Sequence, residues 1–334
     1  MRNLFNIKRT KMIDEAAKHH NPRALGKVFL STFLVFIISN VISNIITTIP
    51  LTIYYFFVSM QNGSYAQVEA AILNGKMSQA TAILYNMMAV LPWWAVLIQL
   101  LSNAVLVGAV IFFWKKFEKR KIASLGIRRG GVALEILFGV GIGLAISCLP
   151  LSISLLSGTL SLKFSMFSPA LLLFAIGFIV YAAGEEFLIH GMLTTSLARD
   201  MKPITSLLIS STIFALLSFS YSLNFMVLIN TFLLNFLLGT FVFKRGSLWG
   251  AIAIRATWGF LCANIFGMGT MGLSPMMSLF SPIYGNAQII SGNSSLGFES
   301  SIITTLVLAS AVLLVLLLKT KESEKSAVEV EYFK

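Results

Sequence analysis

The residues best suited to chemistry lie in one apolar stretch, residues 181–191, which holds Glu185, Glu186 and His190. Ionisable side chains are costly inside a hydrocarbon environment, so they mark functional or structural sites there. Glu186 and His190 are four residues apart and would share one face of a helix, whereas Glu185 would point about 100° away. Two adjacent carboxylates in a low dielectric repel each other, so the pair needs protons, cations or hydrogen-bond donors.

Two further ionisable residues, Arg255 and Glu135, lie in apolar stretches. Arg255 could neutralise one of the two adjacent carboxylates, because an arginine near a carboxylate favours its ionised form. Glu135 lies close to a basic segment, so we expect it to pair with Arg128 or Arg129 in a structural role. From these residues alone, two interpretations of the cluster at 185–190 are equally supported. It is either a functional site or a purely structural set of polar contacts between helices.

The composition identifies the elements that must position these residues. The chain has 334 residues, of which 57% are hydrophobic and 11% are charged, whereas soluble domains carry about 25% charged residues. Long apolar runs predict an all-α polytopic membrane bundle of about eight helices, each long enough for about 30 Å of hydrocarbon. The predicted spans are 27–57, 82–114, 132–157, 169–192, 203–221, 224–243, 247–268 and 301–318. The first two are longer than needed, and Pro50 and Pro92 are expected break points.

The distribution of Lys and Arg predicts the orientation. With the N-terminus inside, 22 basic residues fall in inner segments, and only Lys76 and Lys163 fall in outer loops. This asymmetry predicts that both ends of the chain are cytoplasmic. Because the net charge of +12 is spread over short segments beside apolar spans, we expect contact with the lipid bilayer and no nucleic-acid partner. The two cysteines, Cys148 and Cys262, are far apart in apolar stretches, so no metal site and no cofactor are expected.

Three segments resemble motifs of the CPBP family, which contains the type II CAAX prenyl endopeptidases and their bacterial bacteriocin-processing and immunity relatives, also called Abi proteins. Residues 185–191, Glu-Glu followed by three residues, a basic residue and Gly, resemble the first motif. Residues 210–218 resemble the second motif, Phe-x-x-x-His, and residues 246–260 resemble the third, His-x-x-x-Asn. Residues 123–128, Ala-Ser-Leu-Gly-Ile-Arg, are similar to the entry to the first helix of that domain. The resemblance covers about residues 120–268 and implies a bacterial multi-pass membrane protein.

The resemblance implies an intramembrane peptidase site in which the first glutamate activates a water. Two histidines and an asparagine would hold that water and stabilise the oxyanion, and the second glutamate and an arginine would support the site. This chain keeps both glutamates but places His190, Ser218, Arg255 and Gly259 at the positions of the family's Arg, first His, second His and Asn. Because His190 is the only histidine after residue 20, both family histidines are missing.

The substitutions favour a catalytically impaired relative that acts as a scaffold, regulator or immunity factor by binding a membrane protein or a peptide. Arg255 facing the glutamates would hold a carboxylate ionised and occupy its lone pairs, which makes a poor base. The alternative is an active glutamate-dependent intramembrane endopeptidase that uses Glu185, Glu186 and His190 with substituted helpers. A third possibility is a transporter in which the cluster relays protons or ions, although no inverted pair of halves is apparent in the sequence.

The predicted domain organisation follows the spans and the resemblance. The outer loop 269–300 is rich in Gly, Ser, Pro and Met and holds no basic residue, and it is either a contact surface or a flexible connector. The divisions are a basic cytoplasmic leader at 1–26, two spans with an outer loop at 27–114, a CPBP/Abi-like helical core at 115–268, an outer loop at 269–300, and a final span with a cytoplasmic tail at 301–334.

The orientation can be tested by labelling single cysteines in intact cells with a membrane-impermeant reagent. Cysteines placed in 58–81 and 269–300 should react, and those placed in 115–131 and 319–334 should react only after the membrane is permeabilised. Labelling within 115–131 in intact cells would contradict the predicted orientation.

Overall fold

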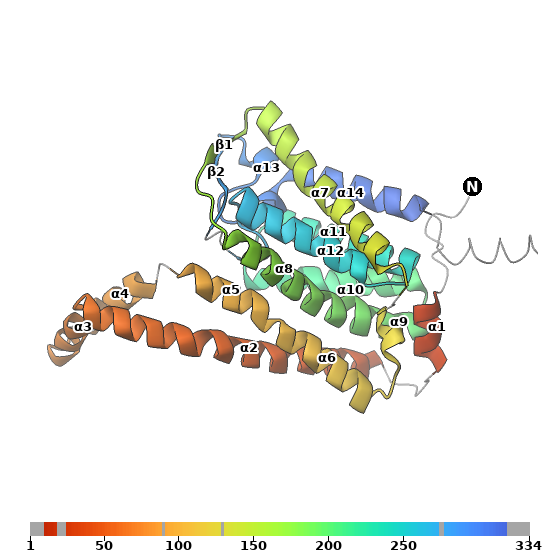
Figure 1. Cartoon of the computed structure of the whole chain (residues 1–334), viewed down its shortest axis with the longest axis horizontal. Coiled ribbons are helices and arrows are strands. Elements are labelled where there is room, and N and C mark those ends of the chain that lie inside the picture. Colours follow the sequence, from red (N-terminus) through yellow and green to blue (C-terminus); the bar gives the residue numbers. More distant parts are fainter. Residues whose placement is uncertain (1–9, 19–24, 89–90, 128–129, 274–276, 319–334) are drawn as a thin grey trace, which may run out of the picture.

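The computed structural model describes residues 10–18, 25–88, 91–127, 130–273 and 277–318, and it is almost entirely helical (Figure 1). The α-helices are α1 (Lys11–Lys18), α2 (Leu25–Gln61), α3 (Ser64–Leu73), α4 (Met77–Met88), α5 (Trp93–Ser102), α6 (Ala104–Lys116), α7 (Val132–Leu156), α8 (Leu171–Glu186), α9 (Thr195–Asp200), α10 (Pro203–Leu217), α11 (Phe225–Arg245), α12 (Trp249–Phe260), α13 (Gln288–Ser291) and α14 (Ile302–Leu317). Two π-helical segments are η2 (Phe187–Thr194) and η4 (Leu261–Ile265), and the 3-10 turns are η1 (Ile122–Leu125), η3 (Ser218–Ser220) and η5 (Phe298–Ser300). The strands are β1 (Leu160–Phe164) and β2 (Phe280–Tyr284).

The predicted all-α polytopic bundle is confirmed. Among the described residues, six helical stretches are long and apolar enough to cross a membrane: Gly26–Gln61, Trp93–Lys116, Val132–Leu156, Leu171–Asp200, Pro203–Ser220 and Phe225–Arg245. The last two predicted spans, 247–268 and 301–318, contain the shorter helices α12 and α14. The chain is therefore a multi-pass membrane protein, and the number of eight crossings remains a prediction.

The N-terminal region differs from the prediction. Helix α2 continues past residue 57 to Gln61 with Pro50 inside it, and the expected outer loop 58–81 contains α3 and the start of α4. The second span begins at Trp93 rather than at residue 82, because Pro92 has an extended backbone and starts a new helix. An apolar pattern cannot separate α4 from α5, since both are apolar and only the break between them distinguishes two helices from one. Figure 1 shows α3 and α4 at the far end of α2, away from the other helices.

Helices α7 and α12 pack closely because glycines of α7 face α12. A Cβ atom added at Gly139 would meet the carbonyl oxygen of Gly250 and would lie 2.7 Å from the Cβ of Ala253. A Cβ atom at Gly143 would lie 2.6 Å from the Cβ of Thr257. This is the close approach that small residues four apart permit between membrane helices, and it sets the position of α12 in the bundle.

Strand pairing and side-chain hydrogen bonds attach the segment between α12 and α14 to the bundle. Strand β2 pairs antiparallel with β1. The carboxylate of Glu299, which is 6% exposed, accepts hydrogen bonds from the Thr270 hydroxyl at 2.9 Å, the Met271 backbone N–H at 2.6 Å and the Tyr221 hydroxyl at 3.2 Å. Burial raises the pKa of the Glu299 carboxyl above its ordinary value, and the three donors oppose that rise.

Glu135 has a partner that was not expected from the sequence. Its carboxylate accepts a hydrogen bond from Nε of Arg245 at 3.1 Å, across the contact between α7 and the end of α11. Arg128 and Arg129 lie outside the described residues. The partner was missed because Arg245 is 110 residues away in the sequence, whereas the expectation rested on nearness along the chain. Glu135 is 2% exposed, so this pair ties two helices together at the predicted cytoplasmic side.

The close packing of α7 on α12 gives a test with an internal control. Gly143→Ala should lower detergent thermal stability, because overpacking a filled site costs about 1–3 kcal/mol. Gly141→Ala, on the same helix, meets nothing within 4 Å and should leave stability unchanged or raise it slightly. Equal melting temperatures for the two variants would contradict this description of the contact.

Candidate functional site

Arg255 is the centre of the polar cluster inside the bundle. Its side chain is 2% exposed and makes three hydrogen bonds to groups on two other helices. Nε donates to Glu186 Oε1 at 2.7 Å, Nη1 donates to Glu185 Oε2 at 2.7 Å, and Nη2 donates to Asn235 Oδ1 at 2.6 Å. The guanidinium therefore bridges two carboxylates and joins α12 to α8 and α11.

The two glutamates end α8, and the helix changes form directly after them. Residues from Phe187 onward adopt the π-helical segment η2, which contains His190. The wider winding offsets carbonyl groups from their usual partners, and the hydroxyls of Thr194 and Thr195 donate to the carbonyls five residues back at 2.8 and 2.7 Å. π-Helical turns are rare and often occur at functional sites. Here the turn places the His190 ring beside Glu186.

His190 and Glu186 share a proton. His190 Nδ1 lies 2.7 Å from Glu186 Oε2, and His190 Nε2 lies 3.2 Å from the backbone oxygen of Asn235. Since a carbonyl only accepts, Nε2 carries a hydrogen, and a second proton must lie between Nδ1 and Oε2 because two lone pairs would otherwise face each other. The two contacts therefore hold the imidazole between Glu186 and the backbone of α11.

Two apolar or small neighbours shape the cluster. A Cβ atom at Gly239 would lie 2.8 Å from Nε2 of His190, so the glycine on α11 leaves the space that the imidazole fills. The guanidinium carbon of Arg255 lies 5.0 Å from the centre of the Phe214 ring, within the range of a cation–π interaction. Helix α10 thus contributes an aromatic face rather than a polar ligand.

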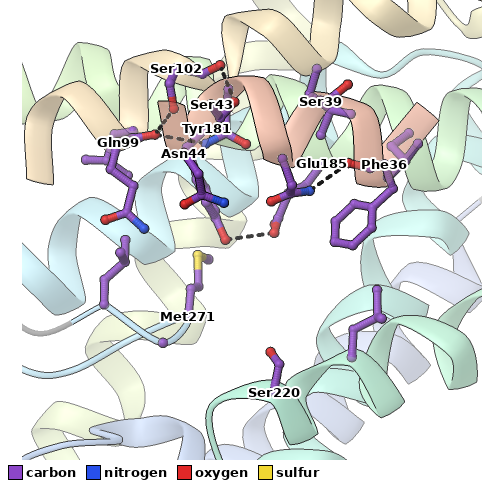
Figure 2. Close-up of a pocket in the computed structure, with 18 of the residues that line it drawn as sticks. Phe36, Ser39, Ser43, Asn44, Gln99, Ser102, Tyr181, Glu185, Ser220 and Met271 are labelled. Carbon is purple, nitrogen blue, oxygen red and sulfur yellow. Dashed lines mark hydrogen bonds between the residues drawn. The ribbon is translucent and has the colours of Figure 1, made fainter. Parts of the chain in front are cut away.

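Glu185 is the acidic member of the cluster that reaches a cavity. Its side chain is 16% exposed, whereas that of Glu186 is fully buried. A cavity of about 340 Å³ extends from Glu185 and Tyr181 toward a row of polar residues on α2. Figure 2 shows Tyr181 and Glu185 facing the same space as Ser220 and Met271. The Tyr181 hydroxyl donates to Glu185 Oε1 at 2.7 Å, so each oxygen of this carboxylate already holds one donor.

The other two substituted family positions do not join the cluster. Ser218 lines the same cavity, but its hydroxyl donates to the Ala215 carbonyl of its own helix at 2.6 Å. A Cβ atom at Gly259 would lie 2.5 Å from the Phe178 ring, so Phe178 fills the space where a side chain at this position would project. The structure therefore brings together Glu185, Glu186 and Arg255 with His190, and it leaves Ser218 and Gly259 apart.

Sequence reasoning missed two members of the cluster, Asn235 and Tyr181. Asn235 is fully buried and donates to the Thr231 carbonyl at 2.8 Å while it accepts from Arg255. Its signal was an amide in an apolar span, which is a polar group that needs a partner. Tyr181 lies four residues before Glu185, and this spacing places both on one helix face. Within the described part of the chain, no group of three His, Cys, Asp or Glu residues is arranged to hold a metal ion.

The cluster predicts how Arg255 variants behave. Arg255→Ala should destabilise the protein more than Arg255→Lys, because truncation strands two buried carboxylates and such losses typically cost about 3–5 kcal/mol. Changing Arg255, Glu185 and Glu186 together to neutral residues should recover much of that loss. Thermal unfolding in detergent measures all three variants, and an unchanged melting temperature for Arg255→Ala would refute the ion-pair description.

Comparison with known proteins shows which family the part of the chain around the cluster resembles. The model of the family described as Type II CAAX prenyl endopeptidase Rce1-like matches residues 167–261, a stretch that holds every member of the cluster. No curated protein and no solved structure matches the chain. The match is narrower than the resemblance expected over residues 120–268, and it confirms that resemblance for residues 167–261. The chain is thus a multi-pass membrane protein that is similar, over residues 167–261, to the Rce1-like type II CAAX prenyl endopeptidases.

Proposed function

We propose that this protein is a catalytically impaired Rce1-like relative that acts by binding a membrane protein or peptide, as a scaffold, regulator or immunity factor. The observation that carries the proposal is the bridge from Arg255 to both glutamates. A general base must present a free lone pair to the water that it activates. In this cluster the guanidinium takes one oxygen of each carboxylate, and Tyr181 and His190 take the others.

The shortage of free hydrogen-bond donors for an oxyanion supports the same proposal. An acyl-transfer enzyme needs donors aimed at the position where negative charge develops, and losing one such donor costs about two to three orders of magnitude in rate. Ser218 donates to its own helix, and Gly259 has no side chain. The guanidinium of Arg255 is the remaining cationic donor near the glutamates, and three of its N–H groups are already engaged.

An active glutamate-dependent endopeptidase is the second candidate, and one observation favours it. Glu185 opens onto a cavity of about 340 Å³, a size typical of ligand sites. A carboxylate has more acceptor positions than the two that Tyr181 and Arg255 occupy. A water bound at a remaining position would be placed for attack on a substrate in that cavity.

Complementation of a deletion strain separates the two candidates. For a non-catalytic protein, Glu185→Gln should restore the wild-type phenotype to the deletion strain, because glutamine keeps the shape of the side chain and can still accept from Tyr181 or Arg255. Glu135→Gln is a matched control, since it neutralises a buried carboxylate far from the cavity. Both variants should accumulate in the membrane at comparable levels, as measured by immunoblotting.

A selective failure would reverse the proposal. If Glu185→Gln accumulates normally but does not complement, while Glu135→Gln does, and an uncleaved membrane substrate builds up, the endopeptidase interpretation is correct. Quantitative proteomics of membranes from the two strains provides the measurement of the substrate.

A further inference from the structure

A groove runs along one side of α2. Helix α2 forms one wall, the C-terminal part of α10 forms the other wall, and η2 forms the floor. The inner part is a cavity of about 410 Å³ with an almost entirely apolar lining, which includes Phe29, Phe33 and Phe36 of α2 and Ile213 and Leu217 of α10. The cavity that reaches Glu185 continues this groove, since the two share Phe36, Leu188, Ile189 and Leu217.

The outer part of the groove has a polar wall. Helix α2 presents Ser39, Asn40, Ser43, Asn44 and Thr47 to it, a spacing that keeps them on one helix face. Figure 2 shows Ser39, Ser43 and Asn44 on this helix beside the cavity. Amides and hydroxyls both donate and accept hydrogen bonds, so this wall suits a neutral polar surface.

One hydroxyl on this wall is unpaired. Ser39 is fully buried in the described structure, lines the cavity, and has no hydrogen-bond partner among the described residues. A buried polar group without a partner costs about 1–3 kcal/mol. Glu185 is the one carboxylate or basic side chain in the lining. It is already paired with Arg255, so the groove favours a neutral ligand over a charged one.

The length of the groove decides what occupies it. From Phe29 to Thr47 it follows α2 for 18 residues, which is about 27 Å at 1.5 Å per residue. The hydrocarbon core of a bilayer is about 30 Å thick, so one lipid chain covers about half of that length. A transmembrane helix covers all of it.

We propose that this groove docks a single transmembrane helix of another protein. The partner helix carries small or neutral polar residues opposite Ser39–Thr47 and apolar residues opposite Phe29–Phe36. This inference rests on the proposed function, because it names the class of partner and the surface that receives it. The polar half supplies the specificity, since amide and hydroxyl side chains bond across helices in membranes.

Site-specific photo-crosslinking in native membranes tests the docking surface. Benzoylphenylalanine is placed at Phe33 in the apolar half, at Asn44 in the polar half, and at Leu137 on the lipid-exposed side of α7 as the control. Phe33 is 56% and Leu137 is 67% exposed. We expect Phe33 and Asn44 to crosslink one and the same membrane protein, within a single transmembrane segment identified by mass spectrometry, and Leu137 to yield no such adduct.

A substitution adds a second measurement. Asn44 is exposed and makes no side-chain hydrogen bond in the described structure, so Asn44→Leu should leave the fold intact. It should reduce recovery of the partner about threefold, the effect of losing one interhelical hydrogen bond in a membrane, whereas Leu137→Ala should not.

The outcomes separate this inference from the proposed function. If a stoichiometric partner co-purifies but Phe33 and Asn44 crosslink only lipid, or a peptide without a membrane segment, the docking inference is wrong and the proposed function stands. If no partner co-purifies with the wild-type protein, both are wrong.

Discussion

A buried guanidinium constrains this molecule more than any other group. Arg255 cannot lose its proton at physiological pH and must be matched by acceptors inside an apolar bundle. Glu185, Glu186 and Asn235 provide those acceptors from two helices, and each is held by a further partner. The placement of α8, α11 and α12 is therefore coupled, because moving one helix would leave a charge or an amide without its partner.

The same contacts support the proposal that the site is catalytically impaired. A charge network is stable inside a membrane when its donors and acceptors are satisfied, whereas a catalytic carboxylate needs an acceptor position open to water. The Glu186 carboxylate is fully buried, whereas the Glu185 carboxylate is partly exposed to the cavity. Structural ion pairing and catalysis would therefore compete for the same carboxylate oxygen atoms.

The sequence was most informative where a residue type is costly in its surroundings. Glu185, Glu186, His190 and Arg255 stood out because charge is rare in apolar stretches, and the long apolar runs indicated the bundle. Asn235 was not singled out because amides recur in these helices and only the packing of α11 shows which one meets Arg255. The position of the His190 ring depends on the space left by Gly239 on another helix. Local sequence patterns therefore indicate that a polar site exists. The hydrogen-bond and ion-pair partners within it depend on contacts between residues distant in sequence.

The cluster also has a consequence for biogenesis. Arg255 follows Glu186 by 69 residues, so α8 is synthesised well before the cation that neutralises its acidic end. Inserting an isolated charged residue at the centre of a membrane helix costs about 2.5–3.5 kcal/mol on the translocon scale. The turns that separate α9, α10, α11 and α12 are short, which keeps these helices near one another during translation. The arrival of α12 thus completes the charge pairing of α8, and a chain truncated before residue 255 would hold both glutamates without this cation.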